Sequence, residues 1–189
     1  LLNLNGAGIQ YRWLHQLMGS LGYEKLNHMA TDVPVGSNGL IVFPFGNGAE
    51  RMFDNKNLNG HISNINFNIH KNNHMVRATL EGIAFALIYG IEILKNDGVM
   101  IEQLKVGNDN LFLSDEFSKT IANTLGVSIE MLETTGAEGA AKASIYKLNK
   151  ETEEEKIKVT KTIRPIVNSY DKYFEAYENW KNQLTNNLI

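Results

Sequence analysis

A run of apolar residues at positions 40–45, Leu-Ile-Val-Phe-Pro-Phe, constrains the fold of this chain more than any other feature. Gly39 and Gly46 bound the run, and no polar residue interrupts it. A continuous apolar run of this length is typical of a strand that is buried on both faces. The sequence therefore predicts a buried strand here, followed by a glycine-rich loop at 46–51.

Helical periodicity, with apolar residues at steps of three and four, recurs in several other segments. Helices are expected at residues 8–21, 75–94, 114–125, from Thr135 onward, and at 167–184. Asn73 is the expected N-cap of the second helix, which Asp97-Gly98 would end. Thr135 and Glu138 have the spacing of a capping box, and the glycine and alanines at 139–143 favour close packing against a sheet or another backbone. The aromatic stripe of the last helix is typical of a core.

Strands are predicted between these helices. Ile65, Phe67 and Ile69 alternate with asparagines, which predicts a strand at 65–69 with one face in water and an antiparallel neighbour. Shorter strands are expected at 103–106 and 128–132. Because strands and helices alternate in this second half, the fold class is α/β. The mostly charged segment 150–161 is interpreted as a solvated connection or the start of an exposed helix.

Size and charge exclude several classes of protein. The chain has 189 residues and no cysteine, which fits one self-sufficient domain in the cytoplasm. Its net charge is −3, and no cluster of basic residues is interleaved with aromatic ones, so nucleic acid is not an expected partner. The longest apolar stretch, 82–94, is interrupted by polar residues and falls short of the roughly 20 residues that cross a bilayer, so no membrane partner is expected.

Few side chains point to catalysis. His70 and His74 are four residues apart, but no third ligand stands at a zinc-site spacing, so a metal site is not expected. The chain has no Gly-x-Ser-x-Gly motif, and Ser114 is interpreted as a helix cap. Glu50 and Arg51 follow the buried strand in the glycine-rich loop. We interpret them as a structural ion pair, with contact to a ligand as the alternative.

The loop 107–110, Gly-Asn-Asp-Asn, lies between an expected strand and an expected helix. Backbone N–H groups at such a position can approach a phosphate or ribose, and the Asn and Asp side chains can add hydrogen bonds to ribose or adenine. The same residues are common in turns, and the loop has neither a Walker A lysine nor the full GxGxxG spacing. The residues alone therefore indicate an α/β domain that binds a nucleotide or another small molecule.

Longer stretches of the sequence are similar to a known family. They are residues 39–51 (Gly-Leu-Ile-Val-Phe-Pro-Phe-Gly-Asn-Gly-Ala-Glu-Arg), residues 80–85 (Leu-Glu-Gly-Ile-Ala-Phe), the strand, loop and helix of 103–125, and Gly139-Ala-Ala with the closing aromatic helix. In order and spacing, over nearly the whole chain, they resemble the C-terminal domain of the FGGY carbohydrate kinases, with the xylulose kinases as the most similar branch. The resemblance implies an actin-like ATPase, ribonuclease H-like fold, which is an α/β domain with a mixed sheet flanked by helices.

The resemblance also implies a site for ATP with Mg²⁺. The adenosine loop would consist of Gly107, Asn108, Asp109 and Asn110. The loop departs from the triple glycine of the family, so contacts from the side chains of Asn108 and Asn110 are expected. In the glycine-rich segment 5–8, matching on Trp13 favours Gly8 and Arg12 as contacts, whereas matching on glycine and glutamine favours Gly6 and Gln10.

In this family the sugar and the aspartate that acts as general base belong to the N-terminal domain. We therefore expect residues 1–189 to be the C-terminal nucleotide-binding domain, cut before Leu1, with no catalytic residue and no activity alone. The full enzyme would phosphorylate D-xylulose to D-xylulose 5-phosphate. The alternatives are a kinase for gluconate, ribulose or glycerol, and a non-catalytic actin-like nucleotide-binding module. The face left by the missing domain could lead the isolated chain to form a homodimer.

Overall fold

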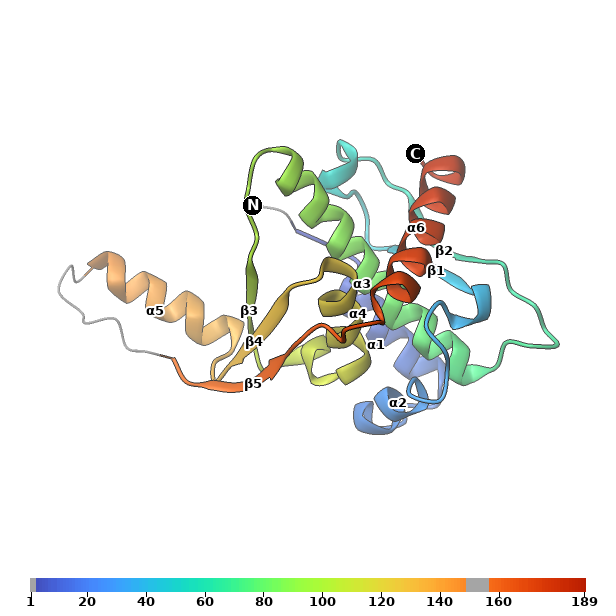
Figure 1. The fold of residues 1–189 in the computed structure, drawn as a ribbon, viewed down its shortest axis with the longest axis horizontal. Coiled ribbons are helices and arrows are strands. Elements are labelled where there is room, and N and C mark those ends of the chain that lie inside the picture. Colours follow the sequence, from blue (N-terminus) through green and yellow to red (C-terminus); the bar gives the residue numbers. More distant parts are fainter. Residues whose placement is uncertain (1–2, 149–156) are drawn as a thin grey trace.

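The computed structural model describes residues 3–148 and 157–189 of the chain (Figure 1). The helices are α1 (Ala7–Leu17), α2 (Tyr23–Met29), α3 (Asn72–Asn96), α4 (Asp115–Leu125), α5 (Gly136–Leu148) and α6 (Tyr170–Asn187). The strands are β1 (Ile41–Phe45), β2 (Asn59–Ser63), β3 (Gln103–Gly107), β4 (Ser128–Leu132) and β5 (Val159–Ile163), and short 3-10 turns form η1 (Ser37–Gly39), η2 (Arg51–Phe53) and η3 (Asn110–Leu113). No helix in these two ranges has the length and apolarity of a membrane-spanning segment.

The described strands form two separate sheets. The strands β1 and β2 pair as an antiparallel ribbon, in which Phe43 faces His61. The second sheet has the order β3-β4-β5, and it is mixed because β3 runs parallel to β4 whereas β5 runs antiparallel to it. The expected α/β class with a mixed sheet is therefore confirmed, with the apolar strand β1 outside that sheet.

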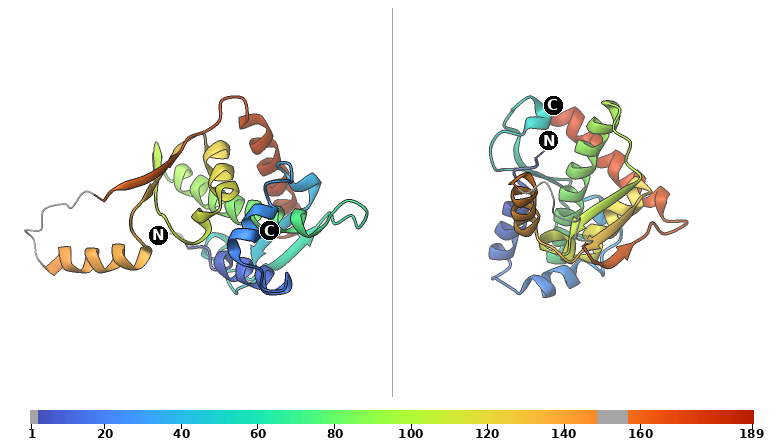
Figure 2. Two further views of the ribbon diagram at one scale, coloured as in Figure 1. Left: turned by 90° about the horizontal axis from the view of Figure 1, so that it is seen from below. Right: turned by 90° about the vertical axis from the view of Figure 1, so that its left-hand side faces the viewer.

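The helix α3 lies at the centre of the molecule, where it contacts β1 and the helices α1, α2, α4 and α6 (Figures 1 and 2). Gly82 allows the closest of these contacts, because a Cβ atom there would lie 2.1 Å from the carbonyl oxygen of Val42 in β1. The same carbonyl accepts a hydrogen bond of 3.0 Å from the indole N–H of Trp180 in α6. These contacts cover β1, and all five of its residues are buried as predicted.

A buried cluster of charged side chains joins α3 to its neighbours. Arg77 and Glu81 form an ion pair of 2.8 Å, and Arg77 also pairs with Glu116 of α4. Glu81 accepts two further hydrogen bonds, one of 2.7 Å from the Ser37 hydroxyl and one of 3.0 Å from the Gly36 N–H. Burial alone lowers the pKa of Arg77, but Glu81 and Glu116 outweigh it and raise the pKa. Every charge in this cluster therefore has a partner.

Most of the predicted elements are present, with shifted ends. The first helix ends at Leu17 instead of 21, because Gly19 and Ser20 adopt left-handed backbone conformations. Lys71 takes the N-cap position of α3 that was assigned to Asn73. Ser114 caps α4 as expected, since its hydroxyl accepts a hydrogen bond from the Phe117 N–H. The helix α2 was not predicted.

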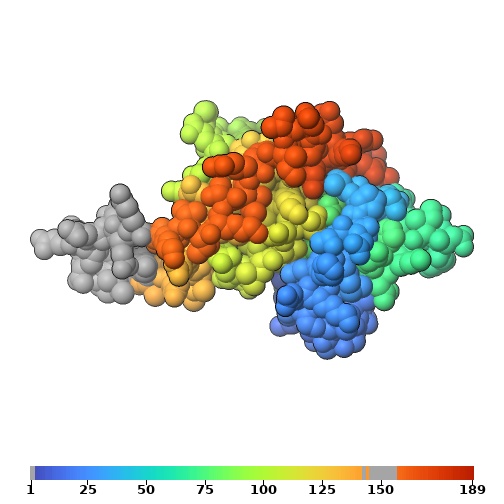
Figure 3. All heavy atoms as spheres, turned by 60° about the horizontal axis from the view of Figure 1, so that its bottom comes forward, coloured from blue at the N-terminus to red at the C-terminus, as the bar shows by residue number. Residues whose placement is uncertain are grey.

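The strand predicted at 65–69 is wrong. The partner of β1 is instead Asn59–Ser63, six residues earlier. Ile65, Phe67 and Ile69 lie in the segment between β2 and α3, which protrudes from the molecule (Figure 3). The side chain of Phe67 is 88% exposed. Their alternation therefore does not reflect the two faces of a sheet.

The C-terminal third also differs from expectation. Part of the segment 150–161 lies outside the described residues, and its end forms β5 instead of an exposed helix start. The helix α5 has its predicted capping box, but its residues 136–141 are exposed where close packing was expected (Figure 1). The aromatic stripe of α6 is divided. Tyr173, Tyr177 and Trp180 are buried in the core, whereas Tyr170 and Phe174 are exposed.

Candidate functional site

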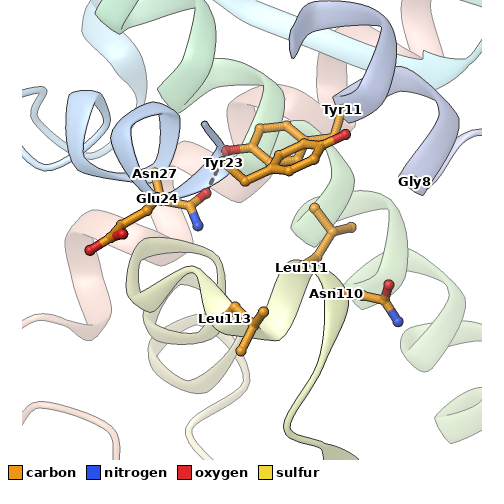
Figure 4. A pocket seen from close by; sticks show the side chains of 8 residues that line it. All are labelled: Gly8, Tyr11, Tyr23, Glu24, Asn27, Asn110, Leu111 and Leu113. Carbon is orange, nitrogen blue, oxygen red and sulfur yellow. Dashed lines mark hydrogen bonds between the residues drawn. The ribbon is translucent and has the colours of Figure 1, made fainter. Parts of the chain in front are cut away.

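A pocket of about 530 Å³ opens between the N-terminal helices and the turn η3 (Figure 4). This volume is in the range of sites for small molecules and cofactors. The residues that line the pocket are Gly8, Tyr11, Tyr23, Glu24, Asn27, Asn110, Leu111 and Leu113. In the space-filling view the N-terminal helices (blue) meet the segment of η3 and α4 (yellow) (Figure 3). The pocket therefore joins parts of the chain that are about a hundred residues apart.

One wall of the pocket is aromatic and the facing wall is aliphatic. The ring centroids of Tyr11 and Tyr23 are 5.7 Å apart, and His15 stacks on Tyr23 at 4.3 Å. Leu111 and Leu113 of η3 lie across from these rings (Figure 4). A flat ring system can lie between such walls with both faces in apolar contact.

Polar groups line the edges of the same pocket. The Tyr11 hydroxyl donates a hydrogen bond to the side-chain oxygen of Asn27, which fixes the orientation of both side chains. Burial, with a smaller contribution from Tyr23, raises the pKa of Tyr11, so its phenol stays neutral. Asn110 lies on the opposite edge, at a left-handed backbone position with φ of 51°. The apolar walls of the pocket are therefore bordered by the side-chain amides of Asn27 and Asn110.

Of the predicted adenosine loop, only Asn110 lines this pocket. Gly107 is held against the neighbouring loop, since a Cβ atom there would lie 2.8 Å from the carbonyl oxygen of Thr134. The backbone N–H of Asn108 donates to the Leu132 carbonyl at 3.0 Å, and its side chain is exposed. Asp109 is the N-cap of η3. The first three residues of the loop therefore shape the turn that presents Asn110.

The two alignments of the glycine-rich segment lead to different cavities. Gly8 lines the pocket with Asn110, whereas Arg12 is exposed and does not line it. Gly6 and Gln10 line a second cavity of about 250 Å³ beside Trp13. Gly6 also has a structural reason to be glycine, because a Cβ atom there would lie 1.5 Å from the carbonyl oxygen of Pro44. The structure brings Gly8 and Asn110 together, and it leaves Gly6, Gln10 and Arg12 outside their pocket.

The expected ion pair between Glu50 and Arg51 is wrong. The side chain of Glu50 is fully buried, whereas Arg51 is exposed. Glu50 has an extended backbone, in which adjacent side chains point to opposite sides. Its carboxylate instead accepts a hydrogen bond of 3.1 Å from the Asn5 N–H. Glu50 therefore contacts the glycine-rich segment that leads into α1.

Most of the pocket was missed by sequence reasoning. Tyr23, Glu24 and Asn27 belong to α2, a seven-residue helix that buries only Leu26. Such a short helix has too few apolar positions for periodicity to reveal it. The available signal was Gly22 followed by an aromatic residue, and it is weak.

The histidine pair has a local structural role. The rings of His70 and His74 are 5.6 Å apart, and the Nδ1 atom of His70 accepts a hydrogen bond of 2.9 Å from the Asn66 N–H. These contacts fasten the protruding segment to the start of α3. Within residues 3–148 and 157–189 no three acidic, His or Cys side chains come together as a metal site would require.

Comparison with known families decides the relationship. Residues 3–147 match the C-terminal domain of the FGGY family of carbohydrate kinases. This chain belongs to that family. The expectation drawn from the motifs at 39–51 and 80–85 is thereby confirmed.

Individual relatives in the family agree. The chain is 31% identical to a xylulose kinase of Haemophilus influenzae over 93 residues, which are 48% of this chain and 19% of that protein. It is 24% identical to a xylulose kinase of Bacillus subtilis over 190 residues, 95% of this chain and 37% of that protein. The chain thus spans less than two fifths of the length of these relatives.

Solved structures of family members share the fold. A xylulose kinase from Rhodospirillum rubrum matches 95% of this chain and 38% of its own with a TM-score of 0.79 at 20% identity. A gluconate kinase from Lactobacillus acidophilus matches 97% of this chain and 39% of its own at 0.74 and 20% identity. A Plasmodium falciparum glycerol kinase with ADP matches 100% and 38% at 0.77 and 19% identity. The fold is therefore that of the actin-like ATPases.

Proposed function

We propose that this chain is the nucleotide-binding C-terminal domain of an ATP-dependent sugar kinase and that the pocket between α1, α2 and η3 binds the adenosine part of ATP or ADP. The observation that carries the proposal is the meeting of Gly8 and Asn110 in one pocket. They come from the two segments that the family resemblance assigns to the nucleotide. The glycerol kinase of similar fold that was solved with ADP supports the same ligand.

The chemistry of the pocket suits adenosine. An adenine ring would lie between Tyr23 and Leu111, since aromatic rings stack on nucleobases without regard to the edge that a base presents. The amide of Asn110 can donate to and accept from a ribose or an adenine edge. The phosphates would extend toward Gly8 and the start of α1, because the first N–H groups of a helix have no partner within it.

The sugar is proposed to be D-xylulose, on the likeness to xylulose kinases. Gluconate, ribulose or glycerol are the alternatives within the family, and gluconate and glycerol kinases share the fold. A different alternative is a nucleotide-binding module without catalysis. The residues that would read the sugar and take its proton are proposed to lie in an N-terminal domain. A cytoplasmic location and a homodimer of the isolated chain remain predictions.

Mg²⁺ is proposed to bind together with ATP, because Mg²⁺ in such sites is held by phosphate oxygens, water and only one or two carboxylates. The described residues hold no cluster of three possible ligands. The proposed task of this domain is to bind and orient the nucleotide.

Titration with ADP tests the proposal. In isothermal calorimetry the chain should bind ADP, and Tyr23→Ala should weaken binding about tenfold, because a lost base stack costs on the order of 1–3 kcal/mol. The matched control is Tyr170→Ala on α6. The two tyrosines are 45% and 47% exposed, but Tyr170 lies outside the pocket.

The control should bind like the wild type. Equal affinity of Tyr23→Ala and the wild type would place the nucleotide elsewhere. With ATP and xylulose the chain alone should show no turnover, and turnover at the rate of a complete kinase would contradict the assigned division of labour.

A further inference from the structure

The carboxylate of Glu50 is unusual among the described acidic side chains, because it is fully buried without a cation beside it. Its side chain has an exposed fraction of 0%, and none of the ion pairs found in the described residues includes it. One oxygen, Oε2, accepts the Asn5 N–H, whereas Oε1 is buried with no hydrogen-bond partner in the described structure. A carboxylate in such a place costs free energy, so its retention calls for a role.

Glu50 is part of a set of contacts that hold Asn5. The Asn5 N–H donates to Glu50 at 3.1 Å, the Asn5 side-chain amide donates to the Ala49 carbonyl at 2.7 Å, and the Asn47 side-chain amide donates to the Asn5 carbonyl at 3.0 Å. The loop 46–50 therefore binds the backbone N–H, the backbone carbonyl and the side chain of one residue. Burial raises the pKa of Glu50, and the backbone N–H groups of Asn5 and Gly6 oppose that rise because they favour the charged carboxylate.

The residues that follow have little freedom. Gly6 is pressed against the carbonyl oxygen of Pro44 in β1, which admits no side chain at this position. The helix α1 begins at Ala7, and Gly8 lines the pocket shared with Asn110. The direction in which α1 starts, and with it the place of Gly8, is thus set by contacts two and three residues earlier.

We propose that Glu50 is a positioning residue for the nucleotide: its buried carboxylate holds the N–H group of Asn5, and so fixes the start of α1 where it meets the phosphates. This inference rests on the proposed function of the pocket. Glu50 itself touches no nucleotide, since it does not line the pocket. It acts through the segment 5–8.

An acceptor without a cation suits this role. A carboxylate has only acceptor sites, so Oε2 can receive the Asn5 N–H, and a glutamine can still offer one oxygen at the same place. Alanine offers none and would leave the Asn5 N–H without a partner. The variants Glu50→Gln and Glu50→Ala therefore separate the hydrogen bond from the side chain that makes it.

The experiment measures ADP affinity by calorimetry and amide hydrogen exchange of residues 5–8 in the wild type, Glu50→Gln and Glu50→Ala. Glu50→Ala should weaken ADP binding about tenfold and speed exchange at Asn5 and Gly6, while Glu50→Gln should keep both within about threefold of the wild type. Arg51→Ala is the matched control, because Arg51 is the exposed neighbour in the same loop. It should change neither quantity.

A second variant guards against a folding defect. Asn47 is exposed and binds the same Asn5 from the other side, so Asn47→Ala should fold normally and weaken ADP binding about threefold. Wild-type affinity and wild-type exchange in both Glu50→Ala and Asn47→Ala would overturn the inference while leaving the nucleotide site intact. A uniform rise of hydrogen exchange over the whole chain in Glu50→Ala and in Asn47→Ala, with Glu50→Gln behaving like Glu50→Ala, would also overturn it. Absence of ADP binding in the wild type would instead remove the proposed function and this inference together.

Discussion

Two buried glutamates in this chain are held in different ways. Glu81 has partners for both of its oxygens in Arg77, Ser37 and Gly36, and its side chain links α3 to the turn η1. Glu50 accepts the Asn5 N–H and has no cation among the described residues, and one of its oxygens has no partner there. Glu81 therefore belongs to a network of paired side chains in the core, whereas Glu50 holds a segment that leads to the pocket.

The difference shows that burial alone does not define the role of a charged residue. Removal of Glu81 takes away one of the two carboxylates that balance the buried charge of Arg77, which is felt by the whole fold. Removal of the acceptor of a backbone N–H group is felt first by the segment that contains that group. Glu81 should therefore control stability, and Glu50 should control the geometry of the pocket.

The largest expected effect follows from breaking the paired cluster. Glu81→Ala leaves Ser37 and Gly36 without their acceptor and leaves Arg77 with Glu116 as its remaining partner, and should lower the free energy of unfolding by about 3 kcal/mol. Urea denaturation followed by circular dichroism measures this change. A loss below that of Glu50→Ala would reverse the proposed division between the two residues.

A smaller effect on the free energy of unfolding is expected for Glu50→Gln, which removes the charge of Glu50 and keeps a hydrogen-bond acceptor. Burial raises the pKa of Glu50 above its usual value of 4.5, although the Asn5 and Gly6 N–H groups oppose the shift. The folded protein therefore takes up this proton at a higher pH than the unfolded chain. The stability of the wild type relative to Glu50→Gln should rise as the pH falls through the pKa of the folded state, and should stop rising below about 4.5.

Denaturation of the two proteins between pH 4 and pH 8 tests this dependence. At neutral pH Glu50→Gln should lie within about 1 kcal/mol of the wild type. Glu81→Gln is the matched comparison and should be clearly less stable than the wild type, because Arg77 loses a charged partner. If the stability of the wild type relative to Glu50→Gln instead falls as the pH is lowered, the Glu50 carboxylate must be stabilised by a cation.

The smallest effect is expected for an ion pair near the surface. Lys181 and Glu92 join α6 to α3 at 2.7 Å, and their side chains are 33% and 31% exposed. Water screens such a pair, so Lys181→Ala should cost less than about 1 kcal/mol in the same denaturation assay. A loss as large as that of Glu81→Ala would mean that exposure is a poor guide to the strength of these pairs.

The sequence predicted elements whose periodicity is long or whose apolar run is unbroken. The helix α3 and the strand β1 are found because burial on nearly all sides needs many apolar residues in a row. The strand β2 was misplaced because it is held by backbone pairing with β1 and its residues are largely exposed. The alternation at Ile65, Phe67 and Ile69 resembles that of a strand, but the sequence does not show which residues pair with a neighbouring strand.

The candidate site was predictable at two points. Gly8 and Asn110 were found through the family resemblance, and their meeting in one pocket depends on the three-dimensional fold. Tyr23 was missed because α2 is short and mostly exposed. Glu50 was assigned to the wrong partner because its true one, Asn5, is 45 residues away along the chain.

The hydrogen bond between Trp180 and the Val42 carbonyl has a consequence for synthesis of the chain. Its two partners are 138 residues apart, and the strand that contains Val42 is made before the helix that contains Trp180. At about 5–20 residues per second, the ribosome adds Trp180 roughly 7–28 s after Val42. During that interval the most apolar strand of the domain lacks the helix that covers it, which is the period in which a chaperone would find the nascent chain most exposed.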